Sequence, residues 1–134
     1  MRALAKDPSL VEIAVSEGIN LVTHKGGHKG RWYPATRTIS LRADLPARAR
    51  RCTLAHELGH AVLGHDAGPE LPQWVVEKQE RAADKWAADL LIDPREYAEL
   101  ETIYEGHLGA IASEMGVTVS LLATWRDNLE MRSA

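Results

Sequence analysis

The chain has 134 residues, of which 45% are hydrophobic and 26% charged, and its formal net charge is −3. These values fit one globular domain and exclude disordered and fibrous proteins. The single cysteine, Cys52, excludes an intrachain disulfide and favours a reducing compartment. No apolar run approaches the roughly 20 residues of a bilayer span, so we expect a cytoplasmic protein with neither a membrane segment nor a signal peptide.

The first third of the chain is expected to form a short helix and a small sheet. Asp7 and Pro8 match the N-cap and first position of a helix, and Gly18 matches its end. Pro34 marks a turn between two runs of strand-forming residues, and the glycine-rich segment 24–30 is expected to be a flexible loop. Strands are predicted at residues 19–23, 31–33 and 38–41.

From Pro46 onward the spacing of apolar residues is helical. Gly64 and the glycines and prolines that follow it end the first long helix, and Asp93 with Pro94 forms a capping sequence for the third. Helices are predicted at residues 46–64, 73–92, 94–105, 107–115 and 119–131.

These elements predict an α+β fold in which a small antiparallel sheet of about three strands packs on a helical bundle. We expect a single domain made of an N-terminal helix and sheet (1–44), two central helices (45–92) and C-terminal helices (93–134). The expected core consists of Ile13, Leu21, Ile39, Leu41, Leu54, Leu58, Val62, Leu63, Val76, Trp86, Leu90, Leu91, Ile111, Leu121 and Leu122.

The most informative stretch is His56-Glu57-Leu58-Gly59-His60, within the first long helix. Histidines four residues apart lie about 40° apart around a helix and about 6 Å apart along it, so both imidazoles can reach one ion. Neutral imidazole is a preferred zinc ligand, and Glu57 lies beside the pair, where a carboxylate can deprotonate a water. The motif therefore predicts a zinc site with Glu57 as general base, although two helical histidines without a metal have the same spacing.

A catalytic zinc usually takes three protein ligands, and Glu80 is the best third candidate. One face of the helix predicted at 73–92 carries Val76, Glu80, Ala83, Ala87 and Leu91. A carboxylate within an apolar stripe is costly unless it is paired or binds a metal. Asp84 lies one turn beyond Glu80, where it can accept the outer N–H of a ligating histidine, and this favours Glu80 over the nearby Glu77.

Other residues near the motif offer alternative ligands. His65 and Asp66 follow it closely, and Asp66 has the spacing of a metzincin third ligand, but Leu63 stands where that architecture needs a glycine. Capping or loop roles account for both residues. Cys52 lies one turn before His56, where a small buried side chain is the more common role.

The stretches LAHELGHAVLGH (54–65) and ERAADKWAADLL (80–91), with the upstream hairpin RWYPATRTISL (31–41), resemble the ImmA/IrrE family of metallo-endopeptidases. The HExxH and ExxxD arrangement is also similar to that of gluzincins. The resemblance implies zinc bound by His56, His60 and Glu80, with Glu57 as catalytic base. Members of this family are often encoded by phages or mobile elements, and the best-known members cleave a helix-turn-helix repressor. A protein substrate of that kind is therefore the expected partner.

A substrate could add to the sheet as an extra strand along Thr38, Ile39, Ser40 and Leu41, if that strand lies at an exposed edge. Residues 24–51 hold eight basic side chains and one acidic side chain, a local charge of +7 that would favour an acidic substrate, although a solvated surface has the same pattern. The candidates for stabilising the oxyanion are Tyr33, Tyr97, Tyr104 and His107, although a structural role is the more common one for each of these residues.

The segment from Ala110 to Trp125 has the spacing of a helix-turn-helix and suggests a competing function, a zinc-stabilised regulator or binding module without catalysis. Glu114 and Asp127 lie on the elements that would contact DNA, and Arg126 is the only arginine or lysine between Arg95 and Arg132. We therefore expect these helices to be a packing scaffold and expect no direct contact with nucleic acid. A structural zinc site would also have no use for Glu57 beside the ion.

Overall fold

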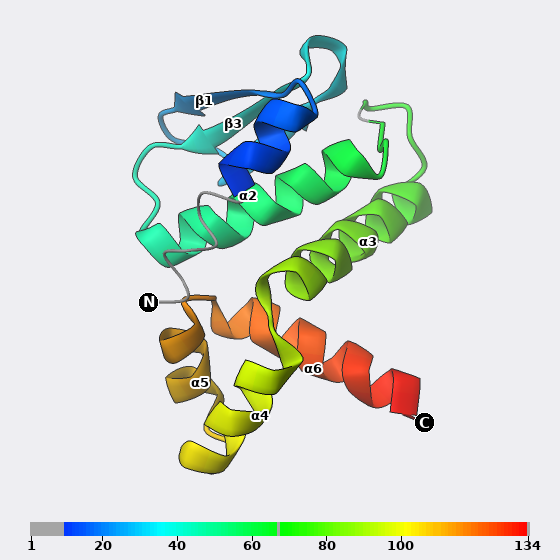
Figure 1. Ribbon diagram of the computed structural model, residues 1–134. Helices are drawn as coiled ribbons and strands as arrows, with labels where there is room; N and C mark the ends of the chain where they lie inside the picture. The colour runs from blue at the N-terminus through cyan, green and yellow to red at the C-terminus, as the bar shows by residue number, and fades with distance from the viewer. Residues whose placement is uncertain (1–9, 67, 134) are drawn as a thin grey trace.

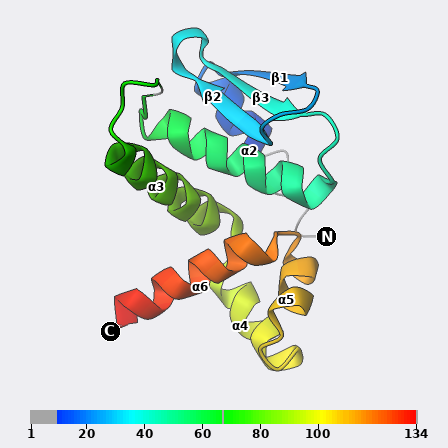
Figure 2. The ribbon, with the colours of Figure 1, turned by 180° about the vertical axis from the view of Figure 1, so that it is seen from behind.

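A computed structural model describes residues 10–66 and 68–133. A helix at residues 10–16 precedes the sheet, and the N-cap predicted at Asp7 lies outside the described residues. Figures 1 and 2 show the sheet against α2 (Ala47–Val62), with α3 (Gln73–Leu91) on the other side of α2. The remaining helices gather at the opposite end of the molecule from the sheet: α4 (Pro94–Ile103), α5 (Leu108–Met115) and α6 (Val119–Ser133).

The α+β class and the three strands are confirmed, but the sheet is mixed and not antiparallel. Its strands are β1 (Asn20–His24), β2 (Gly30–Tyr33) and β3 (Thr38–Arg42), in the order β1-β3-β2. β3 pairs antiparallel with β2 and parallel with β1. The chain reverses after β1 and again after β2, so β1 and β3 run in the same direction. An antiparallel sheet would need β2 between them, whereas here β3 occupies the centre.

The central position of β3 contradicts the expected substrate strand at Thr38, Ile39, Ser40 and Leu41. Both edges of β3 are hydrogen-bonded to neighbouring strands, so no backbone groups remain for an added peptide. Ile39, Ser40 and Leu41 are also buried. The edge nearest α2 is β2, which among the described residues pairs only with β3.

The helices lie within three residues of their predicted bounds, and most of the predicted core is buried. Asp93 caps α4 as expected, since its Oδ1 accepts the backbone N–H of Arg95 at 2.9 Å. Four expected core residues are instead at least 37% exposed: Leu21, Val62, Leu63 and Leu90. Leu21 lies on the exposed edge strand β1, whereas Leu63 and Leu90 line a shallow hollow on the outer side of the α2–α3 pair.

Small residues let α2 and α3 approach closely. A Cβ atom at Gly59 would lie 3.1 Å from the carbonyl oxygen of Ala83 and 3.3 Å from the Trp86 ring, which is tighter than ordinary packing. Ala83 and Ala87 are fully buried at this contact. Because Glu80 lies one turn before Ala83, this contact places its carboxylate opposite the histidines of α2.

Two arginines of α2 hold the end of α5. Arg51 donates from Nη1 to the carbonyl oxygens of Met115 and Gly116, and Arg48 donates to that of Val117. These cations lie at the negative end of the α5 dipole. The apolar residues of α5, α6 and their turn are buried in the core: Ile111, Ala112, Met115, Val117, Leu121, Leu122 and Trp125. Among the described residues, no single helix has the length and apolarity to cross a membrane. α5 and residues 119–131 have that length and apolarity only when taken together, and they are bent by 107° relative to each other.

Candidate metal centre

The structure brings the three predicted ligands together from two helices. α2 presents His56 and His60 one turn apart, and α3 presents Glu80. The Nε2 atoms of the two histidines are 3.2 Å apart, and Oε2 of Glu80 lies 3.4 Å from Nε2 of His56 and in contact with Nε2 of His60. Two imidazole nitrogens and one carboxylate oxygen thus face a common point, a donor set that suits zinc and leaves a coordination position open.

Asp84 lies where the sequence predicts it. Its Oδ1 is 2.7 Å from Nδ1 of His56, on the side of the ring away from the other ligands. The Nδ1–H of His56 therefore donates to Asp84, which leaves the Nε2 lone pair for a metal. The carboxylate fixes both the tautomer of the ring and its orientation.

The alternative ligands lie outside this group. Nδ1 of His65 meets Nδ1 of His60 at 2.9 Å, on the side of the ring that faces away from Glu80. Glu77 is exposed and accepts a hydrogen bond from Gln73 in the same helix. Cys52 is buried, and its sulfur accepts the backbone N–H of Thr118. Asp66 lines the adjoining cavity but does not belong to the group of converging ligand atoms.

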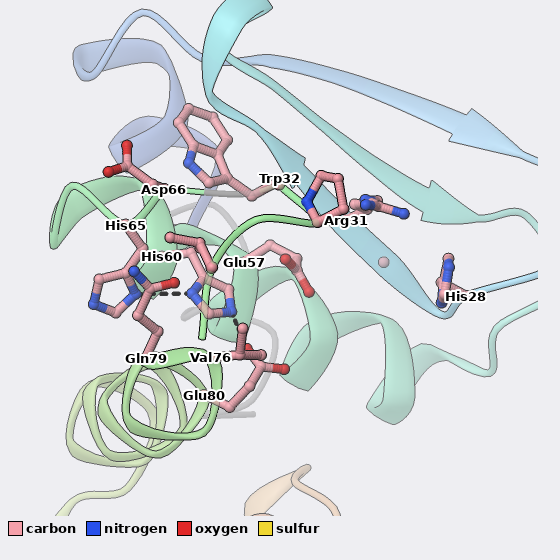
Figure 3. A pocket seen from close by; sticks show the side chains of 14 residues that line it. His28, Arg31, Trp32, Glu57, His60, His65, Asp66, Val76, Gln79 and Glu80 are labelled. Carbon is pink, nitrogen blue, oxygen red and sulfur yellow. Dashed lines mark hydrogen bonds and ion pairs between the residues drawn. The ribbon is translucent and has the colours of Figure 1, made fainter. Parts of the chain in front are cut away.

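Glu57 is buried, with 7% of its surface exposed, and its carboxylate points into a cavity of about 490 Å³ (Figure 3). Burial raises the pKa of this carboxyl above its usual value, while positive charge on His56 and His60 opposes the shift. A carboxylate with a raised pKa beside a metal site suits a group that must first accept and then release a proton.

A second cavity of about 450 Å³ lies on the other side of Glu57, and the two cavities share His28, Gly30 and Glu57. The first is bordered by apolar residues: Trp32, Pro69, Leu71 and Val76. The second is bordered by hydroxyl side chains: Thr53, Thr118, Ser120 and Thr124. Gly30, Arg31 and Trp32 of the edge strand β2 line the first cavity, and Gly30 also lines the second, so an extended chain lying along β2 would pass Glu57.

None of the four residues proposed to stabilise an oxyanion lines either cavity. Tyr97 donates its hydroxyl to Glu101, His107 caps α5, and Tyr33 stacks beside Arg31 on the exposed surface. His28 and Arg31, which the sequence placed in the basic segment 24–51 but not in the site, do line the first cavity.

The loop that carries His28 is held in place and is not the free loop that its glycines suggest. The Nε2–H of His24 donates to the carbonyl oxygen of His28 at 2.7 Å, and Nδ1 of His24 meets the hydroxyl of buried Ser40 at 2.6 Å. Arg42 donates to the carbonyl oxygen of Gly27 at 3.0 Å. These bonds fix the loop to β3. Local sequence spacing does not predict them, because the bonded residues are 15 or 16 positions apart in the chain.

Binding of a metal ion should release a proton from His56. Burial alone would lower the pKa of this imidazole, but contacts with Asp84 and Glu80 raise it to about 10. With its pKa raised in this way, His56 should carry a proton that a bound metal must displace, so we expect release of about one proton per metal ion and an apparent affinity that rises about tenfold per pH unit. Calorimetry in buffers of different ionisation enthalpy measures this release. Asp84→Asn should reduce it, and no release in the wild-type protein would contradict the prediction.

Two comparisons with known proteins found similarities to this chain. Residues 16–124 match the model of a peptidase family described as the IrrE N-terminal-like domain. A solved structure titled Mycobacterium tuberculosis transcriptional regulator superposes with a TM-score of 0.68 at 18% identity, which shows a shared fold. The match covers 92% of this chain and 41% of that one, so this chain spans less than half the length of the regulator. No curated protein sequence matches the chain.

Proposed function

The chain belongs to the IrrE N-terminal-like peptidase family, and on this premise we propose that it is a zinc-dependent endopeptidase. The observation that carries the proposal is the convergence of His56, His60 and Glu80 beside a buried Glu57 that points into an open cavity. A structural zinc site is closed by four protein ligands and needs no base, whereas this group offers three converging ligand atoms among the described residues, with a buried carboxylate beside them.

Each residue of the site has a defined task in hydrolysis. His56, His60 and Glu80 would hold the ion, which when bound acts as a Lewis acid toward a water and the scissile carbonyl. Glu57 accepts a proton as the water attacks the carbonyl carbon, and then donates it to the departing amide nitrogen. The carbon–nitrogen bond breaks. The oxygen of the water becomes part of the new carboxylate, and the proton carried by Glu57 ends on the new amine.

We propose that the substrate binds in an extended conformation along β2. Among the described residues this strand pairs with another strand on one side only, and its Gly30 lines both of the cavities that share Glu57. The backbone N–H of Trp32 donates to Glu57, so this part of β2 already lies against the proposed base. Apolar side chains would fit against Trp32 and Val76, and smaller or polar ones against the hydroxyl-lined side. The basic charge of residues 24–51 favours substrates with acidic residues nearby.

The natural substrate in this proposal is a regulatory protein, and the family resemblance suggests a cytoplasmic helix-turn-helix repressor in a phage or mobile-element setting. The test uses the zinc-loaded protein and a peptide library derived from a proteome, with the cleavage sites identified by mass spectrometry. We expect cleavage that stops with a chelator, returns with zinc and is enriched near acidic residues. Zinc binding without any cleavage would instead support the alternative, a zinc-stabilised binding module.

A further inference from the structure

His60 and His65 form a side-chain pair at the end of α2. Their Nδ1 atoms are 2.9 Å apart, and their ring centroids are 5.1 Å apart with the planes inclined at 64°. Figure 3 shows His60 between His65 on one side and Glu80 on the other. The side chain of His60 is only 12% exposed, so this contact lies largely out of water.

The backbone at the helix end produces this pair. Gly64 adopts a left-handed conformation, with φ of 70°, immediately after the last residues of α2. The N–H of His65 then bonds to the carbonyl oxygen of His60 at 3.0 Å, and the N–H of Gly64 bonds to that of Ala61 at 3.2 Å. This is the Schellman arrangement, which turns the side chain after the glycine back onto the one five residues earlier. That contact is commonly apolar, but here it joins two imidazoles.

The hydrogen-bonding roles follow from the metal site. His60 directs Nε2 toward the common point shared with His56 and Glu80, so its proton must lie on Nδ1. That N–H requires an acceptor, and among the hydrogen bonds of the described residues its one partner is Nδ1 of His65. His65 can accept only as a neutral ring with its own proton on Nε2.

We propose that His65 is a positioning residue for the metal ligand His60, in the way that Asp84 serves His56. It fixes the tautomer and the ring orientation of His60 through the Nδ1–Nδ1 hydrogen bond. The inference rests on the proposed zinc site but adds a residue to it, since His65 lies outside the group of converging ligands. Each of the two ligating histidines then has its own outer partner: a carboxylate from α3 for His56 and an imidazole from the helix cap for His60.

The test compares zinc affinity, measured by competition with a chromophoric chelator, in the wild type, His65→Ala and His65→Asn. Loss of an outer partner typically weakens metal binding by about 10- to 100-fold, and we expect a loss of this size for His65→Ala. Asparagine places its side-chain oxygen near the position of Nδ1, so His65→Asn should recover most of the affinity. Leu63→Ala, which removes an exposed side chain from the same helix end, is the matched control and should bind as the wild type does.

Thermal unfolding without added metal separates positioning from folding, because all four proteins should then unfold at similar temperatures. Wild-type affinity in His65→Ala, with zinc binding lost in His60→Ala, would overturn the role of His65 and leave the proposed zinc site intact. Equal losses in the alanine and asparagine variants would also overturn it, since the hydrogen bond would not be the cause. A wild-type chain that binds no zinc would overturn both proposals.

Discussion

Replacing Glu57 with glutamine should abolish peptide hydrolysis while zinc stays bound. Glutamine keeps the size of the side chain but cannot accept the proton of the attacking water, and general-base catalysis typically contributes about 10²- to 10⁴-fold. Glu57 is not among the three converging ligands, so the metal content should not change. The measurement is the cleavage rate of a library-derived peptide, together with zinc per chain by elemental mass spectrometry.

The control for this experiment is Glu77→Gln, the same chemical change at an exposed position of α3 that borders neither cavity. It should cleave at the wild-type rate. Undiminished cleavage by the Glu57→Gln protein would show that another group takes the proton, and the proposed mechanism would be wrong.

The second large effect is expected from replacing Glu80 with alanine, which should remove most of the bound zinc. Glu80 is the ligand supplied by α3, and without it two imidazoles remain. Losing a direct ligand should cost more than the roughly 10- to 100-fold typical of an outer partner. Equilibrium dialysis of wild type, Glu80→Ala and Glu77→Ala at equal zinc activity measures the difference, with Glu77→Ala expected to match the wild type.

If Glu80→Ala retained its zinc in full, the third ligand would have to be sought among His65, Asp66 and Glu77. Activity alone would not make this distinction, because loss of metal and misplacement of metal both stop hydrolysis. Zinc per chain is therefore the deciding quantity.

The sequence was sufficient to predict those parts of the candidate site whose geometry is determined by local helical periodicity. Helical spacing alone brings His56, Glu57 and His60 to one side of α2, and the same spacing places Glu80 on the face of α3 that carries the buried Ala83 and Ala87. The side chain of Glu80 is itself 52% exposed, so it is not the buried charge that the apolar stripe suggested. The position of Asp84 follows from the same helical repeat, one turn further along. These features depend on about 3.6 residues per turn, which holds in any α-helix.

Other features depend on contacts that spacing does not encode. Strand order is decided by which faces and edges pack best, so alternation could predict three strands but not that β3 lies between β1 and β2. The pairing of His65 with His60 could have been found, because a glycine just after a helix followed by one residue is the signature of a Schellman cap. The exposed Leu63 and Leu90 show that an apolar residue at the end of a helix need not be covered.

The close approach at Gly59 links the packing of two helices to the tolerances of metal coordination. A methyl group at this position would require the backbone of Ala83 or the ring of Trp86 to move by a few tenths of an ångström. Metal–ligand bond lengths are held to within about 0.2 Å, a displacement of the same size. Glu80 belongs to the turn of α3 that would move, so Gly59, which has no side chain to bind a metal, sets the accuracy with which the third ligand meets the other two.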